Sequence, residues 1–470
     1  MGSRKQHRVL LALTIYLVLG LNLTACQAKP PVTPAPTAIP AATSTPALTA
    51  TPVPPPDAFW VDPGQDLGPI SKFVLGANNG PMFFLGSANI EPAKNSGIAF
   101  LRSNGGTAAD RIDIQPFWID LLMNEARLMG AEPSIMVPLL AGSPEKAAAI
   151  VQYANIEKQY GIKYWTIGNE PNEYPKDPAL QSRGFNAVTS AQIWHDFAVA
   201  MKAVDPTIKL YGPDLGQYKK GDPDFDPKDK QGRNYLREFL KINGDIVDIV
   251  TVHRYPFTVC QGCKNPVPTT PAGLLANTPE WDNIIPDVRS VVKEVTSKEL
   301  PVGVTEFNSV NTNLHSSDLS PDGFYNAIWL ADVMGRMIRH RPDILAYWLL
   351  KSTDAGHGLM DSYNLRPTYY VFQLYKHFGN HLLAANSPDD LVSVFAAKRD
   401  DGSVTVILVN RSEAVVKRPL RLESGDALTL SEAYLLDKDH QASAVALLAY
   451  KNGDPVEVPG YSASLFIFKP

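Results

Sequence analysis

Short apolar segments alternate with helix-like segments from about residue 73 to residue 350, and this alternation restricts the fold most. It is typical of βα units, in which parallel strands form a sheet covered by helices. Eight segments are predicted to be strands, at residues 73–77, 98–102, 133–137, 163–168, 208–212, 246–253, 302–306 and 344–350. Eight βα units in roughly 250 residues predict an α/β protein with a (β/α)8 TIM barrel. A doubly wound open sheet is the alternative, but no G-x-G-x-x-G or P-loop motif follows the first strand to support nucleotide binding.

Helix signals lie between several of these segments. Ser143 followed by Pro144 is typical of a helix start, because serine can cap the first turn and proline fits the first helical position. Gly161 is placed to end that helix. The sequence Thr189-Ser190-Ala191-Gln192 has the spacing of a capping box and predicts a second helix that begins there.

The pattern changes after about Gly379, where helix signals give way to short segments with alternating apolar residues. These segments cover residues 391–398, 403–409, 419–422, 433–436 and 463–468. Asp400-Asp401-Gly402 has the chemistry of a hairpin turn between the first two. Residues 379–470 are therefore predicted to form a C-terminal β-sandwich, which a strand near residues 59–61 could complete. Residues 58–378 would form the barrel.

The first residues resemble an export signal. Arg4, Lys5 and Arg8 precede an apolar run over residues 9–21, which is too short to span a bilayer as a stable helix. Leu23-Thr24-Ala25-Cys26 resembles a bacterial lipoprotein box. Residues 1–25 are therefore predicted to be a lipoprotein signal peptide, with Cys26 lipidated. The expected location is extracytoplasmic, with the protein tethered to the bacterial cell membrane.

Residues 26–57 are predicted to be a linker. Residues 27–56 contain ten of the 40 prolines, interleaved with threonine and alanine, and no aromatic residue, so they cannot form a core. The signal peptide carries three of the 43 Lys and Arg and none of the 48 Asp and Glu, so the rest has 40 against 48, a net charge of −8. A mildly acidic chain without a basic run argues against nucleic acid as a partner.

The chain has three cysteines, and Cys260 and Cys263 have C-x-x-C spacing. In an exported protein the simplest interpretation is a local disulfide that closes a loop. A zinc site would need a second pair of ligands, which the sequence does not offer. A redox motif would need a helix that begins at Cys260, whereas the surrounding sequence predicts a loop.

Two glutamates occupy the same kind of position, at the end of an apolar predicted strand. Glu170 ends Tyr164-Trp165-Thr166-Ile167-Gly168-Asn169-Glu170, and Glu306 ends Pro301-Val302-Gly303-Val304-Thr305-Glu306. Active sites of TIM barrels lie at the C-terminal ends of the strands. Two carboxylates there are the groups that hydrolysis of a glycosidic bond requires. Acidic residues also end many strands simply facing water, which would account for either glutamate alone but not for both.

On these motifs the chain resembles the clan A glycoside hydrolases, which are retaining barrel enzymes. The most specific matches are Gly168-Asn169-Glu170-Pro171 and Thr305-Glu306-Phe307. Other motifs resemble the α-L-arabinofuranosidase and β-xylosidase families in particular: Leu101-Arg102-Ser103-Asn104-Gly105-Gly106, Lys202-Ala203-Val204-Asp205-Pro206, His253-Arg254-Tyr255-Pro256 and Pro367-Thr368-Tyr369-Tyr370. Ser103-Asn104 stands where arabinofuranosidases usually have an aromatic residue and proline, so the resemblance does not identify the sugar.

The resemblance implies a role for each glutamate. Glu170 would be the acid/base that protonates the leaving oxygen, and Glu306 the nucleophile that attacks the anomeric carbon. A nucleophilic carboxylate needs neighbours that keep it ionised, and Arg102 and Tyr255 are the candidates. The structural alternative for these two is a salt bridge at the barrel rim and a packed tyrosine.

Three further strand-end residues are candidates for substrate binding. Asn169 could donate to a sugar 2-hydroxyl or only fix the turn. Trp348 offers a flat apolar face to a sugar ring, although most strand-borne tryptophans are core residues. His253 is expected to position the glutamates.

No metal or cofactor is predicted. Asp222, Asp224, Asp226 and Asp229 resemble the start of a calcium loop, but Pro227 stands where such a loop needs glycine. The expected partner is a carbohydrate, cleaved by a retaining glycoside hydrolase acting on polysaccharides or oligosaccharides. The alternative is a lipid-anchored carbohydrate-binding protein that keeps the fold without the chemistry. The sugar, the choice between internal and terminal cleavage and the oligomeric state are not predicted.

Overall fold

The computed structural model describes residues 53–80, 84–259, 265–312, 317–352, 356–423, 427–447 and 449–470. The predicted signal peptide, Cys26, and the cysteines Cys260 and Cys263 lie outside these residues, so their assignments stay predictions. Residues from Val53 to Pro470 belong to one compact unit. Among the described residues, no helix is long and apolar enough to cross a membrane.

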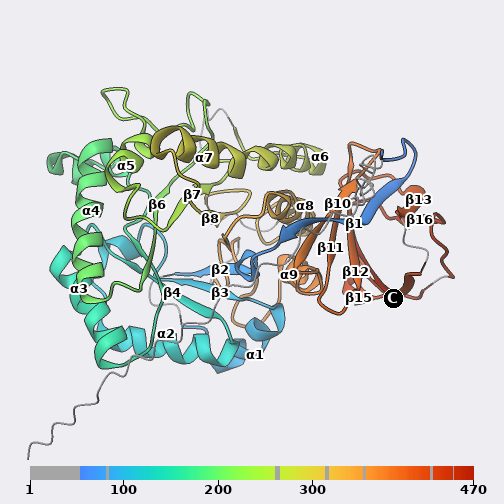
Figure 1. Cartoon of the computed structure of the whole chain (residues 1–470), viewed down its shortest axis with the longest axis horizontal. Helices are drawn as coiled ribbons and strands as arrows, with labels where there is room; N and C mark the ends of the chain where they lie inside the picture. Colours follow the sequence, from blue (N-terminus) through green and yellow to red (C-terminus); the bar gives the residue numbers. More distant parts are fainter. Residues whose placement is uncertain are drawn as a thin grey trace, which may run out of the picture. The chain divides into compact units, whose positions relative to one another are not determined.

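Eight parallel strands close into a barrel, as the alternation in the sequence predicts (Figure 1). They are β2 (Gly76–Asn79), β3 (Phe100–Ser103), β4 (Glu132–Val137), β5 (Tyr164–Ile167), β6 (Lys209–Leu215), β7 (Ile249–Arg254), β8 (Val302–Phe307) and β9 (Ile344–Tyr347). Pairing of Gly76 with Ala346 joins β2 to β9 and completes the ring. The first strand begins later than predicted, because Lys72–Val74 form a 3₁₀ turn capped by Ser71.

Helices surround the barrel (Figure 1). They are α1 (Ser87–Ser96), α2 (Pro116–Met129), α3 (Pro144–Val151), α4 (Ala187–Val204), α5 (Tyr235–Asn243), α6 (Pro271–Leu275), α7 (Trp281–Thr296), α8 (Phe324–Arg339) and α9 (Pro367–Lys376). Ser143 caps α3 as predicted. The predicted start of α4 is wrong: Asn186 is the N-cap, and Thr189 is the third helical residue, whose side chain completes the capping box.

Aromatic rings fill the N-terminal half of the barrel. Phe100 packs against Tyr164 and Tyr211, with ring centroids 5.7 and 6.3 Å apart, and Phe73 covers this cluster. Polar side chains occupy the opposite half, at the C-terminal ends of the strands. The barrel is therefore closed at one end, and only the other end can admit a ligand.

A nine-stranded sheet forms the second part of the body, as predicted for a β-sandwich. Its strands are β1 (Phe59–Pro69), β10 (His381–Asn386), β11 (Val392–Lys398), β12 (Val404–Asn410), β13 (Val416–Leu422), β14 (Thr429–Leu436), β15 (Gln441–Ala444), β16 (Pro455–Val458) and β17 (Ser462–Lys469). The N-terminal β1 lies between β10 and β13, antiparallel to the first and parallel to the second. The sheet thus includes a strand that precedes the whole barrel in sequence.

The sheet packs on helix α8 of the barrel through a close and charged contact. A Cβ atom on Gly335 would lie 2.3 Å from the ring of Phe395, so the helix backbone and this ring are in direct contact. Arg336 donates to Asp332 at 2.8 Å and to the hydroxyl of Ser393 at 3.0 Å. These contacts join the two parts of the body.

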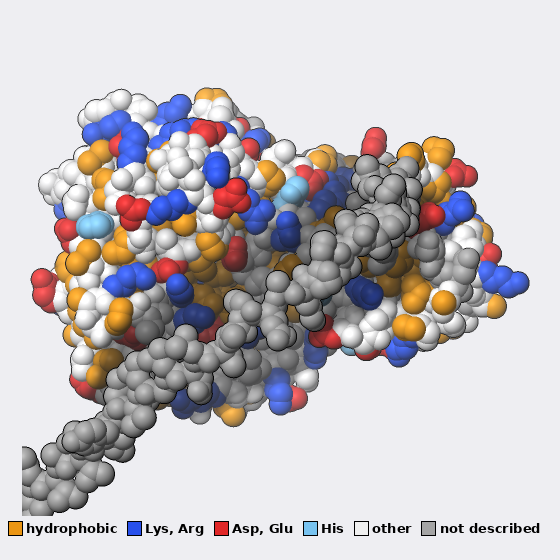
Figure 2. Space-filling model, viewed as in Figure 1, with side chains coloured by type: hydrophobic (Ala, Val, Ile, Leu, Met, Phe, Trp, Pro, Cys, Tyr) orange, Lys and Arg blue, Asp and Glu red, His pale blue; other side chains and the backbone are white. Residues whose placement is uncertain are grey.

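On the face seen in Figure 2, basic and acidic side chains are interspersed.

Candidate active site

The strand ends of the barrel bring four of the predicted site residues to one cleft of about 700 Å³, whereas Arg102, Asn169 and His253 are buried and do not line it. Glu170 follows β5, Glu306 lies near the end of β8, and both line this cleft. Tyr255, just after β7, and Trp348, just after β9, line it as well. Their convergence follows from the barrel itself, because all eight parallel strands end at the same rim.

The two glutamates face each other closely. One carboxylate oxygen of Glu170, one of Glu306 and a ring nitrogen of His253 all lie within 4.8 Å of one another. Glu170 has a φ of 49°, in the left-handed region, and its side chain is 17% exposed, against 5% for Glu306. A Cβ atom on Gly216 would lie 2.9 Å from the Glu170 carboxyl group. Gly216 therefore leaves the space that this carboxylate occupies.

Glu306 is held by two hydrogen bonds from the residues predicted to contact it. The Arg102 Nη1 atom donates to its Oε1 at 2.8 Å, and the Tyr255 hydroxyl donates to its Oε2 at 3.0 Å. Burial raises the pKa of Glu306, while His253 and Arg102 act in the opposite direction and favour the carboxylate. The arrangement fixes both oxygens of a carboxylate that points into the cleft.

His253 lies between the carboxylates. Its Nδ1 atom is 3.1 Å from Oε1 of Glu170 and 3.7 Å from Oε2 of Glu306, and its side chain is fully buried. Burial disfavours the charged imidazole, but Glu306, Asp214 and Glu170 outweigh it and raise the pKa of His253 to about 9. His253 thus lies next to both glutamates, and their charges favour its protonated form.

Asn169 and Trp348 occupy different parts of the rim. The Asn169 Oδ1 atom accepts from Arg102 Nη2 at 3.1 Å, and its Nδ2 atom donates to the Thr107 hydroxyl at 3.4 Å, so its amide is held on both sides. Trp348 is half-buried and forms part of the cleft wall. A Cβ atom on Gly106 would lie 2.6 Å from the indole ring, so the adjacent loop needs glycine there.

Three buried polar residues of the site were not predicted from the sequence. Asn78, in β2, accepts from Arg102 Nη1 at 2.8 Å, and Asp214, in β6, accepts from Arg102 Nη2 at 2.9 Å. Asp110 accepts from the backbone N–H of Asn169 at 3.3 Å and from a tyrosine hydroxyl. The predicted strand 208–212 ended before Asp214, whereas β6 continues to Leu215. Pro213 separates Asp214 from the end of the predicted strand, so the strand-end pattern gave no signal for it.

In the acidic loop that resembles a calcium site, Asp222 and Asp229 accept hydrogen bonds from other residues of the loop. Asp222 accepts from the backbone N–H groups of Asp224 and Phe225 at 3.0 and 3.3 Å. Asp229 accepts from Arg233 Nε at 2.8 Å and from the Arg233 backbone N–H at 3.0 Å. These carboxylates accept hydrogen bonds from nearby residues of the same loop and stabilise its turns.

Glu170, His253 and Glu306 are also close enough together for a metal ion. A metal there would have to replace the proton of His253 and lie near the guanidinium of Arg102, which already donates to Glu306. The arrangement of charges therefore favours proton transfer over metal binding.

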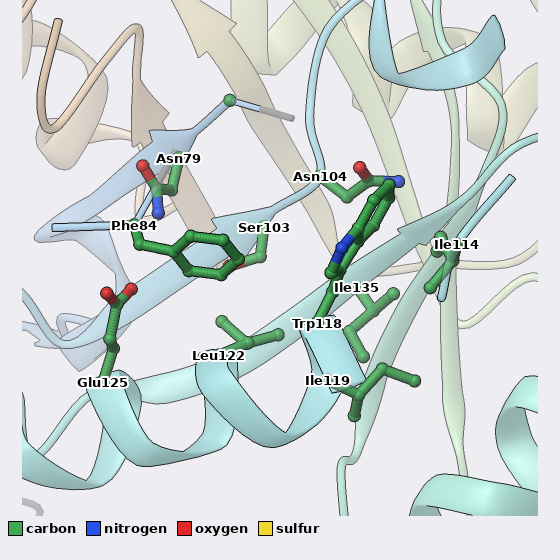
Figure 3. Close-up of a pocket in the computed structure, with 11 residues that line it drawn as sticks. Asn79, Phe84, Ser103, Asn104, Ile114, Trp118, Ile119, Leu122, Glu125 and Ile135 are labelled. Carbon is green, nitrogen blue, oxygen red and sulfur yellow. The ribbon is translucent and has the colours of Figure 1, made fainter. Parts of the chain in front are cut away.

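A second, small cavity lies between α2 and the ends of β2, β3 and β4 (Figure 3). It has a volume of about 50 Å³ and is lined by Phe84, Trp118, Leu122 and other mostly apolar side chains. Ser103 and Asn104, where the sequence departs from the arabinofuranosidase pattern, also line it. Neither residue lines the cleft with the glutamates.

Comparisons with known proteins bear on the fold of this chain. No family model matches the chain. Curated relatives include the heparanase of Bos taurus, 30% identical over 249 residues, and that of Rattus norvegicus, 29% identical over 147 residues. These matches cover 51% and 29% of the chain, and the chain spans 40% and 24% of the length of these relatives.

Solved structures match over most of the body. A bifunctional glucanase-xylanase from a metagenome library has a TM-score of 0.69 at 16% identity, and covers 88% of this chain and 99% of its own. The α-L-arabinofuranosidase of Thermotoga maritima has a TM-score of 0.67 at 17% identity, with 87% and 99% covered. A Paenibacillus polymyxa xyloglucanase of glycoside hydrolase family 44 has a TM-score of 0.68 at 14% identity, with 88% and 99% covered. The chain therefore shares the fold of these three enzymes, a TIM barrel with a β-sandwich.

Proposed function

We propose that this protein is a retaining glycoside hydrolase that cleaves O-glycosidic bonds of polysaccharides or oligosaccharides. The observation that carries the proposal is the short separation of Glu170 and Glu306, with an oxygen of each within 4.8 Å. Retaining enzymes hold their two carboxyl groups about 5 to 5.5 Å apart, whereas inverting enzymes leave room for water between them. The separation here supports direct attack by one of the glutamates.

The surroundings of each glutamate support different roles. Glu306 is the more buried of the two and accepts from Arg102 and Tyr255, which aim its oxygens into the cleft. In the first step it attacks the anomeric carbon while Glu170 protonates the departing oxygen, so that a glycosyl ester forms and an alcohol leaves. In the second step Glu170, now ionised, takes a proton from water. The water oxygen attacks the anomeric carbon, the bond from that carbon to Glu306 breaks, and the sugar is released with its original configuration.

The cleft has charged groups of both signs around it. Among the described residues that line it, the carboxylates are Glu170, Glu173, Asp224, Asp226 and Glu306, and the amino groups are Lys176 and Lys228. Lys176 is paired with Glu173 at 2.7 Å. Arg102 and His253 lie next to Glu306 and Glu170 and compensate two of these carboxylates, so the screen includes neutral and anionic glycans alike.

The test is a screen of the body from Asp57 onward against aryl glycosides and polysaccharides, neutral and anionic. We expect hydrolysis of at least one substrate, and proton NMR of the first product should show the configuration of the substrate. A product of inverted configuration would contradict the retaining mechanism. Sugar binding without hydrolysis of any substrate would favour the non-catalytic carbohydrate-binding protein.

We also propose that lipidation of Cys26 tethers the enzyme to the bacterial cell membrane. The support is the lipoprotein box and the proline-rich linker that follows it. In a bacterial host, the full chain should partition into the membrane fraction, and Cys26→Ser should not be labelled by a palmitate analogue. Equal labelling of both would contradict the proposal.

A further inference from the structure

A third carboxylate lies beneath the two glutamates. Asp214 belongs to β6, and its side chain has no exposed surface. Its backbone has a φ of 54°, in the left-handed region that residues other than glycine seldom adopt. Such conformations persist where surrounding contacts hold them, and they concentrate at functional sites. Because substrate cannot reach Asp214, any effect on catalysis has to pass through the residues that it contacts.

Both oxygens of Asp214 are fully engaged. Oδ2 accepts from Arg102 Nη2 at 2.9 Å and from the Thr166 hydroxyl at 3.0 Å. Oδ1 accepts from the hydroxyls of Thr251 and Thr305, each at 2.5 Å. These donors come from β3, β5, β7 and β8, so one carboxylate joins four other strands of the barrel. Its position is fixed from several directions.

Asp214 also faces His253 from the side opposite to the glutamates. The Nε2 atom of His253 is 3.7 Å from Oδ1 of Asp214, and it has no hydrogen-bond partner among the described residues. The Nδ1 atom of the same ring faces Glu170 and Glu306, at 3.1 and 3.7 Å. The imidazole therefore lies between the buried carboxylate of Asp214, on its Nε2 side, and the carboxylates of Glu170 and Glu306, on its Nδ1 side.

We infer that Asp214 is a positioning residue, the buried counter-ion that holds Arg102 and His253 beneath Glu170 and Glu306. This inference deepens the proposed function and rests on it for the catalytic effect. The backbone adds a further link, because the N–H of Glu170 donates to the carbonyl of Asp214 at 3.1 Å. Asp214 thus reaches the nucleophile through Arg102, and the acid/base both directly and through His253.

The electrostatics of the cluster agree with this geometry. Burial alone would raise the pKa of Asp214, but Arg102 and His253 hold it well below its usual range. Two further titratable groups of the site, Arg102 and Tyr255, hydrogen-bond to Glu306. Removal of the Asp214 charge would leave His253 with less compensation for its burial, so it should lose its proton more easily.

The experiment compares Asp214→Asn with a matched control, Asp332→Asn. Asp332 is also a fully buried aspartate that accepts from an arginine, Arg336 at 2.8 Å, and from a threonine hydroxyl, Thr278 at 2.5 Å. It belongs to the contact between α8 and the sheet, away from the cleft. Both variants lose a buried charge, and only one loses it beneath the glutamates.

The first measurement is an NMR titration of the His253 ring in isotopically labelled protein, which needs no substrate. In the wild type and in Asp332→Asn, His253 should stay protonated up to about pH 9. In Asp214→Asn its midpoint should fall by at least one pH unit. An unchanged midpoint in folded Asp214→Asn, or an equal fall in the control, would overturn the inference.

The second measurement separates kcat from KM on the substrate found in the screen. Asp214→Asn should lower kcat about 100-fold, the size of effect expected when reacting groups are misplaced by about 1 Å, and leave KM nearly unchanged. If Asp214→Asn does not fold, Thr251→Val removes one donor to Asp214 and keeps the charge. That variant should lower kcat several-fold at constant KM, and an unchanged kcat would overturn the inference. A wild type that hydrolyses nothing refutes the proposed function, while the His253 titration still decides whether Asp214 is the counter-ion.

Discussion

The two glutamates have different surroundings although their places in the sequence are similar. Glu306 is nearly inaccessible and accepts from Arg102 and Tyr255. Glu170 is more exposed and contacts His253. A nucleophile must be aimed, whereas an acid/base must exchange protons with leaving group and water. The difference in exposure and hydrogen bonding fits these two duties.

Removal of each glutamate should therefore have a different result. Glu306→Ala lacks the nucleophile and should lose turnover of every substrate. Glu170→Ala lacks only the proton donor, so it should still react with substrates whose leaving group needs no protonation and then accumulate the glycosyl-enzyme. Azide should restore its turnover and give a glycosyl azide of retained configuration, detectable by NMR. The assignment is wrong if azide rescues neither variant or if Glu306→Ala keeps near-normal activity.

The charge on His253 should also appear in the stability of the protein. A pKa of about 9 in the folded state, against the ordinary value of 6.5, stabilises the fold fully below pH 6.5 and is lost as the pH rises through 9. The free energy of unfolding of the wild type, relative to His253→Gln, should therefore fall by about 3 kcal/mol between pH 6.5 and pH 10. Urea denaturation at several pH values measures this difference. A difference that stays constant or grows with pH would show that His253 is not charged in the folded state.

Among the structural elements, the loops after β5 and β6 decide where Glu170 lies. Asn172 and Gly216 exchange two hydrogen bonds, at 3.1 and 2.9 Å, and so join the two loops. Gly216 has its Cα next to the Glu170 carboxyl group, where a methyl group would lie 2.9 Å from it. The position of the Glu170 carboxylate therefore requires a glycine at residue 216.

Gly216→Ala should displace the Glu170 carboxylate and lower kcat by about 10- to 100-fold, with little loss of stability. Gly184→Ala is the control, because Gly184 has a φ of 66° and no atom within 4 Å of an added Cβ. It should lose about 1 kcal/mol of stability from backbone strain and keep its kcat. Steady-state kinetics of both variants measure the loss of kcat, and thermal unfolding measures the loss of stability. Normal kcat in Gly216→Ala would contradict the placement of Glu170.

The elements were easier to predict than the contacts between them. All eight barrel strands could be predicted, because each is a short apolar run between helix signals. Asp214 could not, because Gly212-Pro213 interrupts the apolar pattern although β6 continues through it to Leu215. Arg102 and Tyr255 could be proposed from their strand ends. Their shared contact with Glu306 depends on barrel closure, which brings residues from distant strands together.

At the scale of the whole molecule, the sheet and the barrel depend on each other through α8. The ring of Phe395 packs against this helix at Gly335, and Asp332 and Arg336 are buried nearby. The strand β1, which precedes the barrel, pairs with two strands that follow it. The two parts should therefore unfold together.

Gly335→Ala tests this coupling, because its new methyl group would overlap the ring of Phe395. Overpacking of this kind typically costs about 1–3 kcal/mol. We expect a single unfolding transition at a lower temperature, measured by calorimetry, and unchanged kcat per folded molecule. Two separate transitions in the wild type, or an unchanged melting temperature in the variant, would contradict the account of this interface.

The central claim is that Glu306 forms a covalent bond to the sugar, and mass spectrometry of the trapped enzyme tests it most directly. A 2-deoxy-2-fluoro glycoside with a good leaving group, matched to the active substrate, slows hydrolysis of the intermediate more than its formation. The account predicts that one sugar is added per protein, on the peptide that contains Glu306, and that Glu306→Ala is not labelled. A label on the peptide that contains Glu170, or hydrolysis of the parent substrate with no covalent intermediate and inverted product, would contradict it.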